Sequence, residues 1–310
     1  MTRDSRIDIG ILNIAMHTPH SPADYVRLIS ETYRSKHMVA SRGINSALIG
    51  ALDYVEQNEP IKGITGEIYR FVDLDPNEPW FNVTNKKEAS EDEVKKISIP
   101  DHLKPHLARF SFVFFPVGHR LYLEMKNHGK SISLLAAAAI FEALLSDNKS
   151  LEKFGPVEVT VIPHHDALKN IFRIPFIHQL KIELVRPNPD DHEEEEKKLL
   201  LRLEKNRAKT MQVTLKSSRS ESLIPDAEIK TLAKVAASNG YVCASGRDSS
   251  DEPITRSTKD YPWIERVTYN PDLQARNEVL LQAAARMYHQ SSPTPDFPLE
   301  GADNLQQNPT

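Results

Sequence analysis

The stretch ARFSFVFFPVGHRLYLEMK, residues 108–126, is the strongest indication of fold in the chain. Two runs rich in aromatic and branched apolar residues flank the short segment at residues 116–119. Residues of these types favour extended strands, and the proline and glycine between them favour a tight turn. The stretch therefore predicts a β-hairpin.

Around this hairpin, the first half of the chain shows the patterns of strands and helices. Residues 6–17 begin with apolar and other residues alternating at a period of two, which is typical of a strand. Ser21 and Pro22 follow, and a serine directly before a proline predicts the start of a helix. The remaining elements are a strand, an alanine-rich helix and a second strand, at 63–72, 131–147 and 157–163. With the hairpin counted as a single partner of the strand at 63–72, the order is β-α-β-β-α-β, which is that of a ferredoxin-like unit.

The chain divides by pattern into two halves and a tail. Residues 1–170 form the expected N-terminal ferredoxin-like domain, with an insertion near 73–105 where the sequence is polar and broken by prolines. Residues 171–290 again alternate strand and helix patterns and form the expected C-terminal α+β domain. Residues 291–310 are polar and proline-rich, and are expected to be disordered. The predicted fold class is α+β with two ferredoxin-like halves, each an antiparallel sheet with helices on one face.

Composition limits the classes of protein to consider. The 310 residues carry a formal net charge of −4, which excludes a wholly basic nucleic-acid-binding protein and leaves room for a local basic patch. The single Cys243 forms no internal disulfide and no cysteine-rich zinc site. This and the lack of a secretory signal at the start predict a reducing, cytoplasmic location. The most apolar run, residues 131–145, is shorter than the roughly 20 residues that cross a bilayer, so no membrane association is expected.

Two groups of histidines are candidates for chemistry. His17 and His20 follow the first predicted strand, where a side chain that titrates near neutral pH can act as a general acid or base. His164, His165 and Asp166 follow another strand and are a candidate metal or acid–base site. The alternatives are surface histidines at a helix start and an aspartate that caps the helix after it. The sequence contains no nucleotide-binding or zinc-binding motif, and no metal or other cofactor is predicted.

Positive charge gathers in two segments of the second half. Residues 197–220 hold many more basic than acidic side chains, and residues 239–270 interleave basic and aromatic ones. Cations hold phosphates and aromatic rings stack on bases, so these segments predict a surface for single-stranded nucleic acid. The alternatives are a solvated helix face and a hairpin packed on its neighbour. The residues expected to bind nucleic acid are Arg202, Lys205, Arg207, Lys209, Lys216, Arg247, Arg256, Lys259, Tyr261 and Trp263.

The run NGYVCASGRDSSDEPITRSTKDYPW, with the apolar start IGILNI, resembles an uncharacterised family of bacterial cytoplasmic proteins, which has no activity to carry over. Two ferredoxin-like halves also resemble the RNA-binding repeat-associated mysterious proteins of CRISPR systems. In some of those, a histidine near the first strand and helix helps to cleave RNA without metal, and His17 and His20 occupy a comparable place. The glycine-rich loop of that superfamily is missing, since Gly240 and Gly246 are isolated.

The sequence thus predicts a protein that binds RNA or single-stranded nucleic acid, and the resemblance implies a bacterial phage-defence or mobile-element context. One alternative is a non-enzymatic protein-interaction subunit, such as an antitoxin, an adaptor or a homo-oligomeric scaffold, which the acidic balance favours. The other is a metal-independent ribonuclease that uses His17 or His20, so the sequence leaves open whether the protein is an enzyme.

Overall fold

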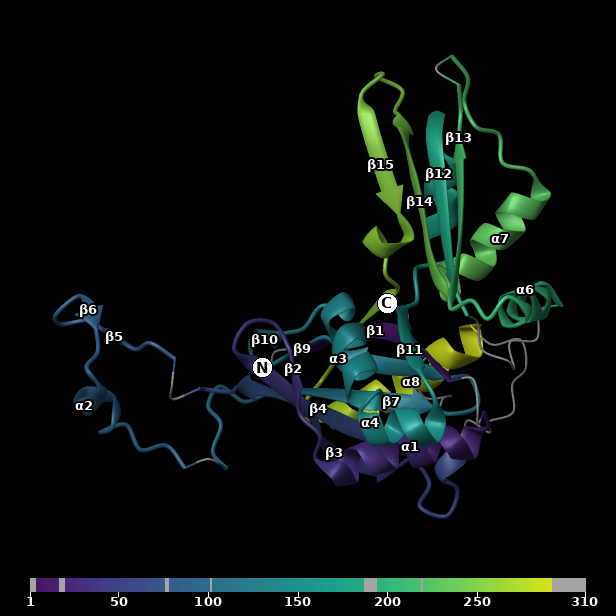
Figure 1. The fold of residues 1–310 in the computed structure, drawn as a ribbon. Coiled ribbons are helices and arrows are strands. Elements are labelled where there is room, and N and C mark those ends of the chain that lie inside the picture. The colour runs from purple at the N-terminus through teal and green to yellow at the C-terminus, as the bar shows by residue number, and fades with distance from the viewer. Residues whose placement is uncertain are drawn as a thin grey trace.

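A computed structural model describes residues 4–16, 20–75, 78–100, 102–186, 194–218 and 220–291. Within these ranges the chain is a mixed α+β structure built around two antiparallel sheets (Figure 1). Among the described helices, none is both long enough and apolar enough to cross a membrane.

The larger sheet has the strand order β11-β1-β8-β7-β4-β3-β2, and β16 joins it by pairing with β1. The predicted hairpin is confirmed, because β7 and β8 pair antiparallel around a turn at residues 116–119. The strands are β1 (Ser5–Met16), β2 (Val39–Ala40), β3 (Asn45–Tyr54), β4 (Ile64–Val72), β7 (Ala108–Phe115), β8 (Arg120–Glu124), β11 (Val157–Val161) and β16 (Ile264–Tyr269).

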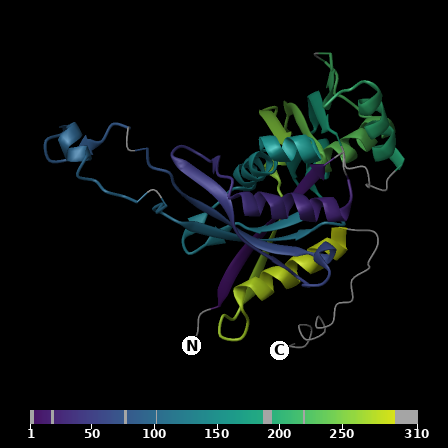
Figure 2. The same cartoon turned by 60° about the horizontal axis from the view of Figure 1, so that its bottom comes forward.

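Helices cover both faces of this sheet, which explains why ten consecutive residues of β1 are buried. Alternate residues of a strand point to opposite faces. Leu12 and Ile14 therefore pack with the helices on one face, and Ile9 and Ile11 pack with the helix on the other. The first face carries α1 (Pro22–Ser35), α3 (Leu134–Leu145) and α4 (Asn148–Phe154), and the second carries α8 (Arg276–Ser291) (Figure 2). The expectation of helices on one face only is wrong for this sheet.

The predicted start of α1 is confirmed. Pro22 is the first residue of the helix, and the Ser21 side chain accepts a hydrogen bond from the backbone amide of Asp24. This bond satisfies one of the amide groups that have no partner within the first turn of a helix.

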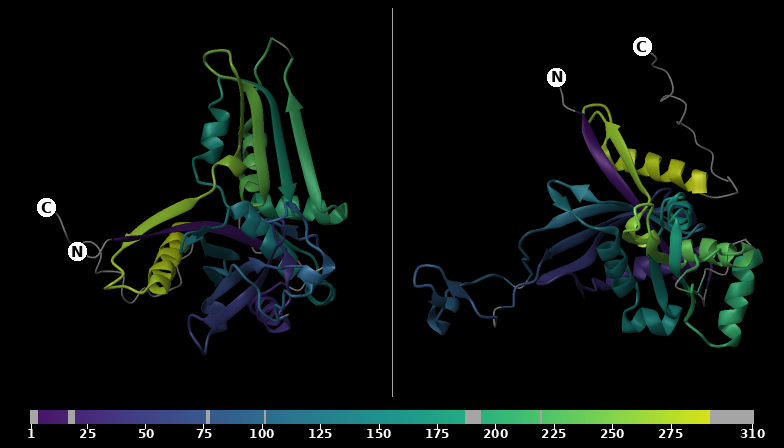
Figure 3. Two further views of the ribbon diagram at one scale, coloured as in Figure 1. Left: turned by 90° about the vertical axis from the view of Figure 1, so that its left-hand side faces the viewer. Right: turned by 90° about the horizontal axis from the view of Figure 1, so that it is seen from above.

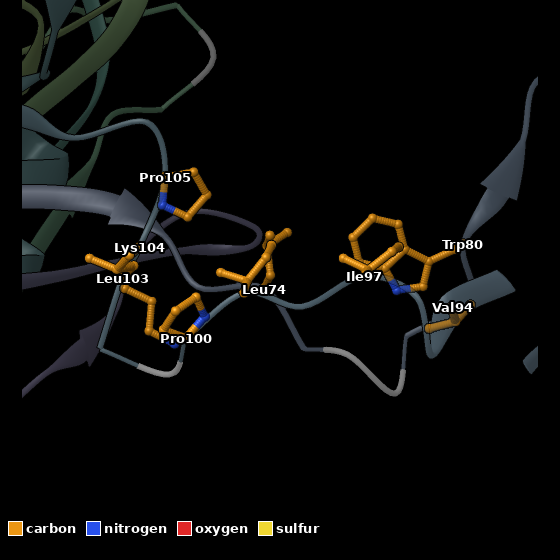
Figure 4. A pocket seen from close by; sticks show the side chains of 9 residues that line it. Leu74, Trp80, Val94, Ile97, Pro100, Leu103, Lys104 and Pro105 are labelled. Carbon is orange, nitrogen blue, oxygen red and sulfur yellow. The ribbon is translucent and has the colours of Figure 1, made fainter. Parts of the chain in front are cut away.

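The segment expected as an insertion near residues 73–105 extends from the sheet as an arm (Figure 1). Its elements are β5 (Phe81–Asn82), β6 (Lys87–Glu88) and α2 (Glu91–Val94). Figure 4 shows Trp80 beside Ile97 and Val94, and Leu74 nearer the base of the arm. Another short strand pair, β9 (Lys126–Asn127) and β10 (Lys130–Ser131), follows β8.

The smaller sheet has the order β13-β12-β14-β15. Its strands are β12 (Phe176–Val185), β13 (Thr210–Lys216), β14 (Gly240–Arg247) and β15 (Pro253–Ser257). One face packs its apolar side chains, such as Leu180, Ile182 and Val242, against α5 (Ala167–Phe172), α6 (Glu194–Lys205) and α7 (Ala227–Ser238). Here the expected arrangement, an antiparallel sheet with helices on one face, is what the structure has (Figure 3).

After this sheet the chain returns to the larger one through a short 3₁₀ helix, η2 (Thr258–Asp260). The first half of β1 pairs with β16, from Ser5 opposite Tyr269 to Gly10 opposite Ile264, and its second half pairs with β11. Strand β16 and helix α8 therefore lie on the larger sheet, although their residues fall within the segment 171–290 expected as a separate domain. The smaller sheet is left with the order β-α-β-α-β-β, which differs from the β-α-β-β-α-β order expected for a ferredoxin-like half.

The boundary near residue 170 stays a prediction. Of the tail expected at residues 291–310, only residue 291 lies within the described ranges.

Candidate nucleic-acid interface

The smaller sheet has a polar face opposite its helices, here called the open face. Figures 1 and 3 show the helices on one side of the four strands. Because side chains alternate along a strand, the residues between the buried ones point to the other side. Residues that lie opposite one another on β13, β12 and β14 form rows across this face. The central row is Thr214, Lys181 and Cys243. The rows on either side are Lys216, Gln179 and Ser245, and Gln212, Glu183 and Tyr241.

Tyr241 lies between two lysines on the open face. The ammonium of Lys181 donates a hydrogen bond to the Tyr241 hydroxyl at 2.5 Å, and that of Lys259 lies 3.7 Å from the centre of the Tyr241 ring. Lys181 also lies 3.3 Å from the Glu183 carboxylate. The bond to Tyr241, followed by that to Glu183, raises the pKa of Lys181. The ring is thus held in an electropositive setting in which cations already contact its π-face and its hydroxyl.

Further aromatic and basic groups lie toward the free end of this sheet. The Phe176 and His178 rings are 4.8 Å apart, beside a β-bulge in β12. Phe176 is opposite Arg247, whose guanidinium forms a 2.7 Å ion pair with the exposed Asp251. Ion pairs this exposed contribute little to stability, so Arg247 remains able to exchange its partner.

The predicted nucleic-acid-binding residues fall into separate places. Lys216, Arg247 and Lys259 lie on or beside the open face. Arg202 and Lys205 are exposed on α6, on the helix side of the sheet. Within the described residues, the basic side chains therefore do not form one continuous groove from the end of α6 to the β14–β15 hairpin.

The other predicted residues contact the protein itself. Arg256 donates to the Asn170 carbonyl oxygen at 2.7 Å and joins β15 to α5. Tyr261 and Trp263 lie on the segment that returns to the larger sheet, where Trp263 packs against its core. Neither ring is part of the open face.

Arg207 and Lys209 line a groove of about 360 Å³ between β11 and the end of α6. Lys209 lies 3.4 Å from Glu158, a carboxyl that is only 5% exposed. Burial raises the pKa of Glu158, and the nearby Lys209 partly offsets this. The groove thus pairs a buried acid with a cation and connects the two sheets.

The predicted catalytic histidines are only partly described. His17 lies outside the described residues. His20 is half-buried, and its Nδ1 lies 2.5 Å from the Met16 carbonyl oxygen. Because a carbonyl only accepts, Nδ1 carries the proton, and Nε2 is the basic nitrogen of the neutral ring. The Tyr25 hydroxyl lies 3.4 Å from the same Nδ1.

The structure adds a third ring that the sequence reasoning missed. His119, in the turn of the β7–β8 hairpin, packs 4.9 Å from His20 and 4.6 Å from Tyr25. Its side chain is buried, and burial lowers its pKa to about 3, with smaller effects of His20 and Arg120. His119 is therefore neutral at physiological pH. Its position after proline, valine and glycine marked it as a turn residue, and nothing local pointed to its burial.

His164, His165 and Asp166 lie together after β11. Asp166 occupies the position before α5, but its side chain makes no capping hydrogen bond to this helix. His20 does not reach this cluster. Residue 16 pairs with the first residue of β11, whereas the cluster follows its last, so the strand separates them.

Comparison with known proteins places the chain in a family. A family model described as Domain of unknown function (DUF4747) matches residues 5–285. No curated protein matches the chain.

Proposed function

Since the chain belongs to the family described as Domain of unknown function (DUF4747), a description that gives no activity, we propose from the geometry that its open face binds single-stranded RNA. The observation that carries this proposal is Tyr241, whose ring lies between Lys181 and Lys259 on a polar antiparallel sheet. Sheet surfaces that bind single strands combine an aromatic platform for bases with cations for phosphates.

The proposed binding mode follows from the contacts. A base stacks on the Tyr241 ring and takes the place of the Lys259 ammonium, which turns to a neighbouring phosphate. Lys181 stays bonded to the Tyr241 hydroxyl and adds positive charge beside the same nucleotide. Gln179 and Ser245, in the row beyond Lys181, offer hydrogen-bonding groups to the base edges and ribose 2′-hydroxyl of a neighbouring nucleotide.

Two finer features belong to the same proposal. The order β11-β1-β8-β7, with α1 and α3 on one face, supports a ferredoxin-like unit in the larger sheet, extended at one edge by β4, β3 and β2. The single half-buried Cys243 supports a cytoplasmic location, where thiols stay reduced.

Binding of fluorescein-labelled single-stranded RNA, followed by anisotropy over a salt series, tests the proposal. Stacking on one ring contributes about 1–3 kcal/mol, so Tyr241→Ala should weaken binding roughly 5- to 150-fold. Tyr241→Phe keeps the ring and should bind nearly as wild type. Lys259→Ala should reduce the salt dependence by roughly 0.7 in the log–log slope, because it removes one phosphate contact, and Lys181→Ala should reduce it less.

The matched control is Lys205→Ala, which removes the same charge from the helix side. It should leave the affinity within about twofold of wild type, because screening weakens charges that lie beyond a Debye length of about 8 Å. No binding at low salt, or equal losses in Lys205→Ala and Lys259→Ala, would refute the proposal.

A protein-interaction role is the second candidate, and the arm favours it. Phe81 and Val83 are 66% and 75% exposed near its tip. Exposed apolar side chains on a projecting segment are typical of contact surfaces. Light scattering of the wild type and of a Phe81→Ser/Val83→Ser variant checks this, and an assembly present only in the wild type would support it.

A further inference from the structure

The cluster of His164, His165 and Asp166 lies where the chain crosses between the two sheets. The first crossing leaves β11 and enters α5, and the second returns from η2 to β16. The two crossings run side by side, since the His164 amide donates to the Tyr261 carbonyl oxygen at 2.8 Å. The Trp263 amide donates to the Ile162 carbonyl oxygen at 2.9 Å. The cluster therefore sits on the junction that joins the sheets.

The spacing of the donor atoms suits a metal ion. One ligand atom from each of the three residues lies within 4.8 Å of the others. The Asp166 Oδ2 lies 3.3 Å from His165 Nε2 and 3.9 Å from His164 Nδ1. Bonds of about 2.0–2.2 Å at a tetrahedral angle place two ligand atoms roughly 3.3–3.6 Å apart. The 3.9 Å between Asp166 Oδ2 and His164 Nδ1 is too long for a hydrogen bond and is close to the separation of two ligand atoms on one metal ion.

The hydrogen bond at His164 also suits a metal ligand. His164 Nδ1 accepts a hydrogen bond from the Asp166 amide at 3.3 Å, so this nitrogen is unprotonated, as a metal ligand must be. The bond is long, and a metal would replace it. The two ring centres lie 4.0 Å apart with their planes tilted by 35°. The side chains are between 42% and 70% exposed, so a hydrated ion can reach them.

The second oxygen of the aspartate has its own partner. Lys169, one turn into α5, lies 3.6 Å from Asp166 Oδ1. This ammonium orients the carboxylate and leaves Oδ2 toward the histidines. It also places a positive charge close to an incoming cation, so it opposes binding.

We propose that His164, His165 and Asp166 bind a divalent late first-row metal ion such as Zn²⁺, with water completing the coordination. Two imidazoles and one carboxylate bind Zn²⁺, Ni²⁺ and Cu²⁺ better than they bind Mg²⁺ or Ca²⁺, which take oxygen ligands. The bound ion fixes three consecutive residues of the segment that connects β11 to α5. It thereby stiffens the junction that sets the orientation of the open face to the larger sheet.

The two tryptophans of the chain allow a direct test. Trp263 has its ring 6.5 Å from that of His164, whereas Trp80 lies on the arm. In a Trp80→Phe background, Cu²⁺ bound at the cluster should quench the emission of Trp263 and saturate near one equivalent. Excess Zn²⁺ should restore the emission, because it competes for the same donors and does not quench.

Variants then assign the site. His165→Ala and Asp166→Asn should weaken binding at least about tenfold, since each removes one of three ligands. His128→Asn, at an exposed histidine outside the cluster, should bind as the background does. Lys169→Ala should tighten binding up to about fivefold, the size of an exposed charge–charge interaction. Near-ultraviolet circular dichroism confirms that each variant is folded.

Two results would overturn the proposal. One is saturable quenching that persists unchanged in the folded His165→Ala/Asp166→Asn double variant. The other is an absence of quenching below millimolar Cu²⁺ in the folded Trp80→Phe protein.

Discussion

Acidification should destabilise this protein through a single buried histidine. His119 is 2% exposed, and burial among His20, Tyr25 and the hairpin lowers its pKa from 6.5 to about 3. The folded state therefore binds this proton more weakly than the unfolded state does. His119 costs no stability above about pH 6.5, and it lowers the free energy of unfolding progressively as the pH falls from there to about 3.

The magnitude follows from the shift. At about pH 4.5, two units below the ordinary histidine pKa, His119 alone lowers the free energy of unfolding by about 2.7 kcal/mol. A typical domain is stable by roughly 5–15 kcal/mol, so the effect is a large fraction of the total. Urea unfolding at about pH 7.5 and about pH 4.5 measures it as the change in the free energy of unfolding.

Two substitutions isolate the histidine. His119→Phe keeps a ring in the site, and His119→Asn suits the left-handed backbone, with φ of 55°. Neither substitute titrates, so both should avoid about 2.7 kcal/mol of the acid-induced loss, whatever their stability at neutral pH. Burial raises the pKa of Glu124 and Glu158, which act in the opposite direction. They are present in every variant and cancel in the comparison.

The control is His128→Asn, an exposed histidine that also has a left-handed backbone, with φ of 44°. It should lose as much stability on acidification as the wild type. Acid losses in His119→Phe and His119→Asn equal to that of the wild type would show that His119 does not lie buried and neutral, and the reasoning would fail.

Three further substitutions test how the sheets are held. Arg276→Met removes the side chain that donates two hydrogen bonds to Oε1 of the fully buried Glu124, and should cost about 3–5 kcal/mol in urea unfolding near pH 7. The cost should shrink as the pH falls, because Glu124, whose pKa burial raises, then takes up a proton. Gly246→Ala places a methyl group 1.8 Å from the Phe176 carbonyl oxygen and should lower stability by about 1–3 kcal/mol, seen as an earlier thermal transition. Ser21→Ala removes the cap of α1 and should cost about 1 kcal/mol in the same assay, with no change in RNA affinity.

Local pattern predicted the elements and could not predict how they assemble. The hairpin at residues 108–126 was readable because its apolar runs and its turn lie next to each other in sequence. The pairing of β1 with β16 could not be predicted, because it joins residues about 250 positions apart and nothing local in either strand specifies the other. The first was predicted as a strand, whereas residues 264–269 were assigned to the C-terminal α+β domain, and burial against α8 decides the sheet to which they belong.

The candidate interface shows the same limit at the level of side chains. Lys216 and Lys259 were predicted to bind nucleic acid from local charge, and the structure places both beside the open face. Lys181 was missed, because its contact with Tyr241 depends on the register between β12 and β14. Trp263 was chosen for its aromatic ring, which packs on the larger sheet instead. Cross-strand register, which single residues do not encode, decided which basic and aromatic groups meet.

The pairing of the first strand with the last has a consequence for synthesis on the ribosome. The first half of β1 meets its partner only when residues 264–269 have emerged, after the whole smaller sheet has been made. Chains are made at about 5–20 residues per second, so the edge of β1 waits on the order of ten seconds or more for β16. During that time one of its edges and the face later covered by α8 are exposed. The larger sheet thus begins to form first and is completed last, and the smaller sheet can fold before its neighbour is finished.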